Sequence, residues 1–221
     1  YGGHLMTQRL RSRYGTPRGS LGTMKTLALD FDGVIASTQA AKVQFACEAF
    51  GLDLDESLLK GPHFVEIFGH DEGNRLYTEV YRGVYGSERM LTDVAPVPGA
   101  RAGIAALQAR GYRCLVVTSR DGPADDPDSL AGWAWRFLAH HDFPVQHADF
   151  FTTGRQSKLA ICQATAACAL VDDDYEKLLP VMAAGLPGYL FTTVANADDE
   201  TRHSPFLAIR VHDWDHLLAI L

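Results

Sequence analysis

The sequence has no uninterrupted apolar stretch of membrane-spanning length, which excludes a helix that crosses a bilayer. It also has no excess of positive charge, because its formal net charge is −7, and we therefore expect no nucleic acid as its main partner. The four cysteines form no CxxC pair and no HExxH motif is present, which argues against a zinc site. Reduced, buried thiols of this kind predict a cytoplasmic protein.

The composition is that of an ordinary globular protein, with 47% hydrophobic and 21% charged residues in a chain of 221. Residues 1–23 differ from the rest, because they contain four arginines and no acidic residue. We expect this segment to be a disordered leader or an extension added for expression, with a transit-type presequence as the alternative. The remaining length suits one domain with an insertion or two small domains.

An apolar run over residues 25–29 ends abruptly in Asp30 and Asp32, which are followed by Gly33. The run predicts a β-strand, and side chains alternate along a strand, so the two carboxylates should lie on one side of it. Like charges at this spacing repel each other unless a cation lies near them. Gly33 then allows the chain to turn sharply away from the end of the strand.

The rest of the chain predicts an α/β protein with a helical insertion. Residues 38–50 have helical spacing, residues 52–95 show only helical signals, and residues 96–99 form a hinge-like stretch. Strands and helices alternate afterwards, with expected strands at 112–117, 149–151, 168–171, 188–191 and 207–211. This alternation predicts a Rossmann-like parallel sheet with helices on both faces, formed by residues 24–36 and 96–221. Residues 37–95 would be a small all-helical cap.

Polar side chains follow the first, second and fourth of the expected strands. Because the carboxyl ends of parallel strands meet at one edge, Asp30, Asp32, Thr118 and the run Asp172–Asp174 should lie close together. Carboxylate oxygens suit Mg²⁺, and a carboxylate that attacks phosphorus forms an aspartyl-phosphate. Phosphoryl transfer also needs positive charge and hydrogen-bond donors, which the Thr118 hydroxyl and the Lys158 ammonium can provide.

Four short motifs carry a resemblance to a known family. They are Asp30-Phe-Asp-Gly-Val34, Val116-Val-Thr-Ser119, Lys158, and Val171-Asp-Asp173 followed by Ala184-Gly185. In this order and spacing the chain resembles the haloacid dehalogenase-like hydrolase superfamily, specifically phosphatases with a helical cap. The Thr118–Ser119 and Asp172–Asp173 pairs, with Trp133 between them, give a weaker resemblance to the deoxyribonucleotidase branch.

The resemblance implies a role for each motif residue. Asp30 would be the nucleophile, Asp32 the general acid and base, and Thr118 and Lys158 the phosphate ligands, with Ser119 and Arg120 beside them in substrate binding. The Mg²⁺ ligands would be Asp30, Asp32 and Asp173, with Asp172 next to them, and which of Asp172 and Asp173 ligates directly stays open. Two positions depart from the usual pattern, where many relatives have aspartates and this chain has Ser37 and Lys177.

The predicted function is a Mg²⁺-dependent phosphatase that acts on a small phosphorylated metabolite such as a sugar phosphate or nucleotide, as a monomer or homodimer. A phosphomutase and a non-catalytic phosphate-binding module remain alternatives, whereas Asp32 argues against a dehalogenase. A phosphonate hydrolase would need a cap lysine that forms an imine, for which Lys42 and Lys60 are present. Substrate specificity is expected to come from the cap, and its candidate residues are His63, Glu66, His70, Arg75 and Arg82, together with Arg120 from the core.

Overall fold

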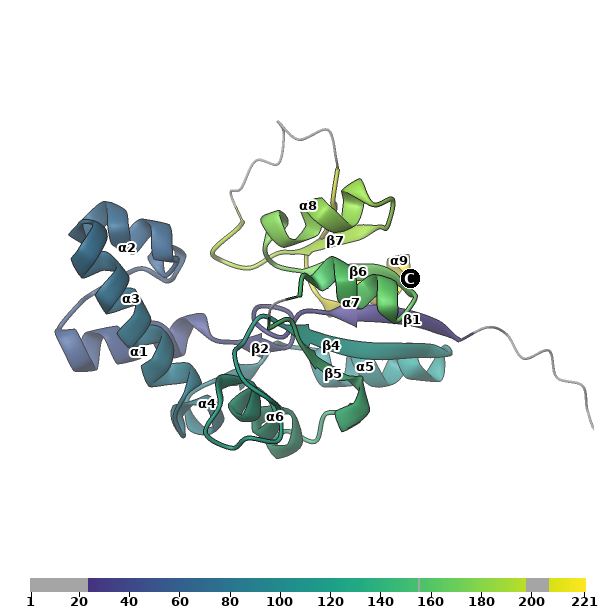
Figure 1. The fold of residues 1–221 in the computed structure, drawn as a ribbon, viewed down its shortest axis with the longest axis horizontal. Helices are drawn as coiled ribbons and strands as arrows, with labels where there is room; N and C mark the ends of the chain where they lie inside the picture. Colours follow the sequence, from purple (N-terminus) through teal and green to yellow (C-terminus); the bar gives the residue numbers. More distant parts are fainter. Residues whose placement is uncertain (1–23, 155, 198–206) are drawn as a thin grey trace, which may run out of the picture.

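The computed structural model describes residues 24–154, 156–197 and 207–221, so the predicted leader at residues 1–23 lies outside the described residues. Six parallel strands form one sheet in the order β5-β4-β1-β6-β7-β8 (Figure 1). Their bounds are β1 Lys25–Leu29, β4 Tyr112–Thr118, β5 Phe150–Thr152, β6 Ala167–Asp172, β7 Gly188–Phe191 and β8 Ile209–Val211. The predicted α/β fold with a parallel sheet is confirmed.

Helices cover both faces of the sheet, and the alternation of apolar side chains along each strand explains why. In β1, Leu27 and Leu29 pack into one core cluster, while Ala28 between them belongs to the cluster on the opposite face. A strand buried on both faces must be apolar at every position, which is the continuous pattern of its sequence. One face is covered by α5 (Ala100–Ala109), α6 (Leu130–His140) and α9 (Trp214–Ile220), and the other by α7 (Lys158–Ala164) and α8 (Tyr175–Ala183).

The insertion between β1 and α5 is helical and lies beyond the carboxyl ends of the strands (Figure 1). Its elements are α1 (Gln39–Phe50), the 3₁₀ turn η1 (Glu56–Leu58), α2 (Gly61–Phe68), α3 (His70–Tyr85) and α4 (Arg89–Thr92). These helices enclose a small apolar cluster of their own, made of Ala46, Leu59, Phe64, Leu76 and Val80. We use the word cap for residues 37–95.

Two short strands that the sequence did not predict join the cap to the sheet domain. β2 (Ala36–Ser37) pairs antiparallel with β3 (Ala95–Pro96), so the chain enters and leaves the cap through one two-stranded ribbon. Each strand has only two residues, too few for a periodic signal. The cap end nearest the ribbon is also tied to the main core, because Val84, Tyr85 and Met90 pack in the same cluster as the strands. Among the described residues, no helix is long and apolar enough to cross a membrane.

Side-chain caps fix where the two helices beside the site begin. The Ser157 hydroxyl accepts a hydrogen bond from the backbone N–H of Ala160, which starts α7 at Lys158. The Asp174 carboxylate accepts one from the backbone N–H of Glu176, which starts α8, as the sequence predicted. Both caps place functional side chains in the first turn or just before it, at the carboxyl edge of the sheet.

Trp214 ties the last helix to the loop that follows β1. Its indole Nε1 donates a hydrogen bond of 2.9 Å to the carbonyl oxygen of Val34, across 180 residues of sequence. The ring is buried against Gly103 of α5, where any Cβ would collide with it. The Val34 carbonyl belongs to the loop that follows Asp30, so this hydrogen bond helps to fix the position of that loop.

We expect Trp214→Phe to lower the free energy of unfolding by about 1–3 kcal/mol, because the Val34 carbonyl loses its buried donor. Trp214→Ala should cost about 3–5 kcal/mol, because it also leaves a cavity beside Gly103. Urea denaturation followed by far-ultraviolet circular dichroism measures both values. Equal stability of Trp214→Phe and the wild type would show that this hydrogen bond contributes nothing.

Candidate active site

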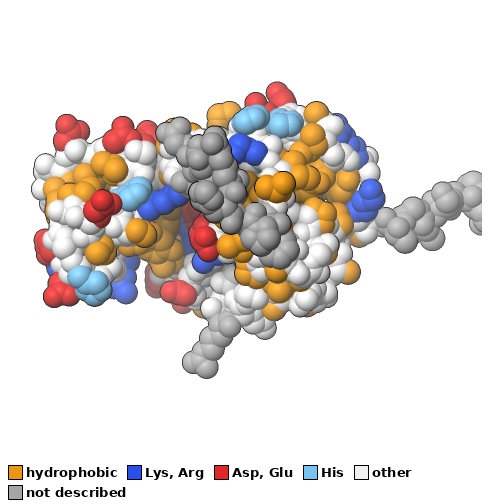
Figure 2. Space-filling model, turned by 90° about the horizontal axis from the view of Figure 1, so that it is seen from above, with side chains coloured by type: hydrophobic (Ala, Val, Ile, Leu, Met, Phe, Trp, Pro, Cys, Tyr) orange, Lys and Arg blue, Asp and Glu red, His pale blue; other side chains and the backbone are white. Residues whose placement is uncertain are grey.

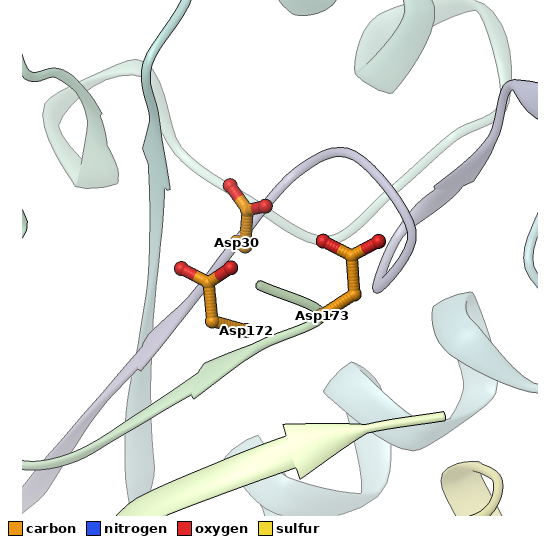
Figure 3. A group of neighbouring side chains, drawn as sticks. All are labelled: Asp30, Asp172 and Asp173. Carbon is orange, nitrogen blue, oxygen red and sulfur yellow. The ribbon is translucent and has the colours of Figure 1, made fainter. Parts of the chain in front are cut away.

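Three carboxylates meet at the carboxyl ends of β1 and β6. Among the described residues, Asp30, Asp172 and Asp173 each offer an oxygen, and these oxygens lie within 4.8 Å of one another (Figure 3). The two strands are neighbours in the sheet, and the backbone N–H of Asp30 donates to the carbonyl oxygen of Val171 at 2.8 Å. The register of the sheet therefore brings together acids that are more than 140 residues apart, as predicted.

Lys158 lies between two of these acids. Its Nζ is 2.6 Å from Oδ1 of Asp30 and 2.7 Å from Oδ2 of Asp172, and the side chain is buried. Burial alone would lower the pKa of this lysine, but the two carboxylates raise it above its ordinary value. Lys158 is therefore a fixed positive charge in the site.

One ammonium does not balance three neighbouring acids, of which Asp30 and Asp172 are buried and Asp173 is partly buried. Burial raises the pKa of Asp30 well above its ordinary value, and although Lys158 lowers it, Asp172 and Asp173 raise it further. Burial also raises the pKa of Asp173 to about 7, with added repulsion from Asp172 and Asp32. A bound cation would stabilise the ionised form of these acids, and the effect is largest where burial and repulsion oppose ionisation. The donor set fits a hard divalent ion, because every atom it offers is a carboxylate oxygen.

Asp32 is held differently, although the sequence predicted it as a fourth metal ligand. Its carboxylate accepts two hydrogen bonds from Arg120, at 3.1 Å from Nε and 2.8 Å from Nη2. Although burial raises the pKa of Asp32, Arg120 holds it below its ordinary value. The carboxylate of Asp32 is not part of the three-acid group.

Arg120 is a buried member of the site rather than an open cation. Only 1% of it is exposed, and its guanidinium lies 4.7 Å from the ring centroid of Phe31 and 3.9 Å from that of Tyr85. The Arg120 guanidinium donates to both oxygens of the Asp32 carboxylate, which is the bidentate geometry that arginine favours. The sequence assigned Arg120 to substrate binding, whereas the structure places it first as the partner of Asp32.

The predicted phosphate residues of the second motif lie at the end of β4. Thr118 is fully buried, and its hydroxyl oxygen accepts a hydrogen bond of 3.2 Å from the backbone N–H of Arg120. Ser119 follows it and lines the cavity between the cap and the sheet domain. Ser37 and Lys177, where the chain departs from the family pattern, line the same cavity.

The turn after Asp30 admits only glycine at residue 33. Gly33 has a φ of +77°, which side chains rarely adopt, and a Cβ at this position would collide with the Asp173 carboxylate. This close approach packs the β1 turn against the β6 end. It explains physically why a glycine follows the two acids.

A cavity of about 1100 Å³ opens over these residues, between the cap and the sheet domain. In Figure 2, acidic and basic side chains meet in the depression between the cap, on the left, and the sheet domain. The five cap residues that the sequence proposed for specificity, His63, Glu66, His70, Arg75 and Arg82, are not among the residues that line it. Arg75, for example, pairs on the surface with Glu72 and Glu79, at 2.6 Å each.

Other cap residues line the cavity instead. Tyr77, Tyr81 and Tyr85 occur at intervals of four along α3 and face it together, with Lys42 from α1 beside them. Residues four apart share one face of a helix, so the tyrosine spacing was a readable signal of an aromatic face. The adjacent Leu76, Val80 and Val84 form a buried apolar face of α3. Leu76 and Val80 pack in the apolar cluster of the cap, and Val84 packs in the main core.

Comparison with known proteins adds evidence about the fold. No protein-family model and no curated protein matches the chain. Among solved structures, a hydrolase of the haloacid dehalogenase-like family from Streptococcus pneumoniae aligns with a TM-score of 0.56 and 14% identity, over 89% of this chain and 98% of that one. The chain has the haloacid dehalogenase-like hydrolase fold.

Two further structures agree. A protein described as a predicted phosphoglycolate phosphatase from Haemophilus somnus has a TM-score of 0.61 and 17% identity, over 89% of this chain and 97% of that one. A hydrolase of this superfamily, subfamily IA, variant 1, from Geobacter sulfurreducens has a TM-score of 0.54 and 16% identity, over 90% and 96% of the two chains. At these identities the likeness to haloacid dehalogenase-like hydrolases concerns the fold alone.

Removing one acid of the cluster should stabilise the metal-free protein. We expect Asp173→Asn, in EDTA at pH 8, to raise the free energy of unfolding by about 1–3 kcal/mol. The raised pKa of Asp173 means that its ionised form opposes folding. The gain should shrink as the pH falls from about 7 toward 4, where the wild-type carboxyl becomes protonated in both the folded and the unfolded chain.

Urea denaturation at several pH values tests this expectation. In millimolar MgCl₂ the order should reverse, so that the wild type has the higher free energy of unfolding and Asp173→Asn the lower. Asp55→Asn, which changes an exposed acid that caps η1, serves as the control and should show no such reversal. A wild type that is as stable as Asp173→Asn in EDTA at pH 8 would contradict the proposed repulsion.

Breaking the Arg120–Asp32 pair from one side should be costly. Arg120→Met removes the bidentate partner of a partly buried carboxylate, and we expect a loss of about 3–5 kcal/mol in the free energy of unfolding. The double variant Arg120→Met/Asp32→Asn should recover part of that loss, because no uncompensated charge remains. A double-mutant cycle from urea denaturation measures the coupling, and strictly additive losses would rule it out.

Proposed function

We propose that the protein is a Mg²⁺-dependent phosphatase that hydrolyses a small phosphomonoester through an aspartyl-phosphate intermediate. The observation that supports this most is the position of Asp30, with one oxygen bound by Lys158 and its carboxylate beside Asp172 and Asp173. The haloacid dehalogenase-like fold, which places this edge of the sheet under a helical cap, agrees with the proposal.

Asp30, Asp172 and Asp173 would hold the ion. When bound, Mg²⁺ would neutralise the repulsion among these acids and offset the negative charge of the phosphoryl oxygens. The Lys158 ammonium adds a second fixed positive charge next to the nucleophile. In the metal-free site burial and repulsion raise the pKa of Asp30, so its reactive, ionised form depends on these positive charges.

In the first step an Asp30 oxygen attacks phosphorus and the bond from phosphorus to the ester oxygen breaks. The leaving oxygen takes up a proton, from Asp32 when that carboxyl is protonated and otherwise from water, and departs as an alcohol. In the second step water attacks phosphorus, the Asp30–phosphorus bond breaks, and inorganic phosphate is released. The Lys158 ammonium keeps the Asp30 carboxylate oriented through both steps, and the cap limits access of bulk water.

Asp32 suits the second step best in the arrangement described. Arg120 keeps its carboxylate ionised, which is the state that accepts a proton from the attacking water. To protonate the leaving oxygen in the first step, Asp32 must first gain a proton, which the Arg120 pair disfavours. Esters of acidic alcohols need the least help at this step, so they should be the better simple substrates.

The competing functions make different predictions for the same assay. A phosphomutase would return the phosphoryl group to the sugar rather than release phosphate. A phosphate-binding module would bind phosphate esters without turnover. No feature of the described site favours either over hydrolysis, and the acids and the lysine around Asp30 favour turnover.

The decisive variant is Asp30→Asn. We expect it to lose about a thousandfold or more in phosphate release from para-nitrophenyl phosphate with Mg²⁺, because an amide cannot serve as the nucleophile. Its fold should persist, since an asparagine preserves the shape and removes one of the repelling charges. Asp213→Asn, the same change at the N-terminal cap of α9, is the matched control and should keep full activity.

Rapid quenching provides a direct check, since wild-type protein should carry acid-stable, hydroxylamine-sensitive phosphate, and Asp30→Asn should carry none. Turnover by Asp30→Asn at the wild-type rate would exclude an Asp30 nucleophile. No turnover by the wild type with Mg²⁺ would instead favour the binding module.

A further inference from the structure

Lys42 is a buried cation that forms no ion pair with the side chain of any described residue. Three cationic side chains are buried among the described residues, and two of them form ion pairs, Arg120 with Asp32 and Lys158 with Asp30 and Asp172. Lys42 is 7% exposed, yet no carboxylate of the described residues forms an ion pair with it. Burying an unpaired ammonium costs free energy, so its position calls for a reason.

The contacts of Lys42 are weak ones for a charged group. Its Nζ donates a hydrogen bond of 3.3 Å to the side-chain oxygen of Gln39, one turn earlier in α1, and lies 5.1 Å from the ring centroid of Tyr85. Burial lowers the pKa of Lys42 to about 8, although the charges of Asp32 and Asp173 raise it. Gln39 and Tyr85 carry no negative charge, so they do not neutralise the Lys42 ammonium, and it keeps its capacity to bind an anion.

Lys42 also lines the cavity, on the side of the cap. Asp30, Asp173 and Lys158 line the same cavity from the sheet domain, where the phosphoryl group would bind. Lys42 is in the first turn of α1, directly after the β2 ribbon, and the Thr38 hydroxyl is hydrogen-bonded to the Tyr85 hydroxyl at 3.0 Å. The ammonium is thereby held at the boundary of cap and core, in the same cavity as the proposed nucleophile.

We propose that Lys42 binds a second anionic group of the substrate, carried by the leaving alcohol. The substrate class is then a phosphomonoester whose alcohol carries a carboxylate or a further phosphate. This inference rests on the phosphatase function proposed above. Tyr81 and Tyr85 form the wall beside Lys42 and exclude water from the ion pair, which strengthens it.

Matched esters test this directly. 2-Phosphoglycolate and 2-hydroxyethyl phosphate differ only in a carboxylate against a hydroxymethyl group, and glucose 1,6-bisphosphate and glucose 6-phosphate differ in a second phosphate. In at least one pair, we expect the wild type to prefer the more anionic ester by roughly tenfold or more in kcat/KM. The pair that shows the preference identifies the anion as carboxylate or phosphate.

Lys42→Met should reduce that preference roughly 10- to 100-fold, mainly through KM, because the ion pair is lost. Lys42→Arg should restore part of it, which a merely structural role for the side chain would not predict. Lys25→Met removes one positive charge at the opposite end of β1 and is the control that should leave both esters unaffected. The proposal is overturned if the wild type hydrolyses both members of each pair equally well, or if Lys42→Met slows both members of a pair equally.

A separate readout keeps this proposal distinct from the phosphatase function. Isothermal titration calorimetry with the Asp30→Asn variant and Mg²⁺ measures binding of 2-phosphoglycolate and glucose 1,6-bisphosphate without turnover. Adding Lys42→Met should weaken binding of the preferred ester by the same factor. If para-nitrophenyl phosphate is hydrolysed while this binding is unchanged, the Lys42 subsite is wrong and the phosphatase stands. If no ester is hydrolysed but binding weakens, the subsite stands and the phosphatase is wrong.

Discussion

Electrostatic repulsion at the ends of β1 and β6 is the constraint on which the site depends. Asp30, Asp172 and Asp173 are brought together by strand pairing, and burial raises the pKa values of all three, with repulsion from neighbouring aspartates added at Asp30 and Asp173. Among the described side chains, the Lys158 ammonium is the one that forms ion pairs with this cluster. A site built this way would gain stability from a bound cation, which agrees with the proposed function.

The surrounding structure supplies the stability that this repulsion removes. Trp214 anchors the loop after Asp30, and the alternating apolar side chains of β1 and β6 pack against helices on both faces. Gly33 permits the tight turn that places the loop against Asp173. The acids therefore sit on rigid elements rather than on a free loop, and their mutual distances are set by the sheet.

Much of this could be predicted from the sequence, and the reason is the periodicity of the sheet. Near-continuous apolar strands require parallel packing, and parallel packing sends Asp30, Thr118 and Asp172 to one edge without any knowledge of side-chain rotamers. The Ser157 cap then puts Lys158 at the start of its helix, facing that edge. The positions of these residues follow from local sequence patterns and from the topology that those patterns predict, so they can be derived from the sequence.

The cap was predicted less well, because its contacts with the core depend on how two packed units meet. Within the sheet domain, the Arg120–Asp32 pair likewise joins residues 88 apart through an orientation that no local pattern encodes. For the same reason Lys42 had no context in the sequence, and charged residues on exposed helix faces, such as Arg75, were assigned to the site instead. The tyrosines of α3 were the one cap signal available, at intervals of four.

Under the proposed function, the charges around the cavity divide catalysis and substrate choice between two parts of the chain. The sheet domain would contribute the acids and Lys158, which act on the phosphoryl group common to all phosphate esters. The cap would contribute Lys42 and the tyrosines that line the cavity, which contact the alcohol beyond the ester oxygen. Substrate choice could then change through α1 and α3 while the chemistry at the sheet edge stays fixed, because among the described side chains no ion pair joins Lys42 to the acids at that edge.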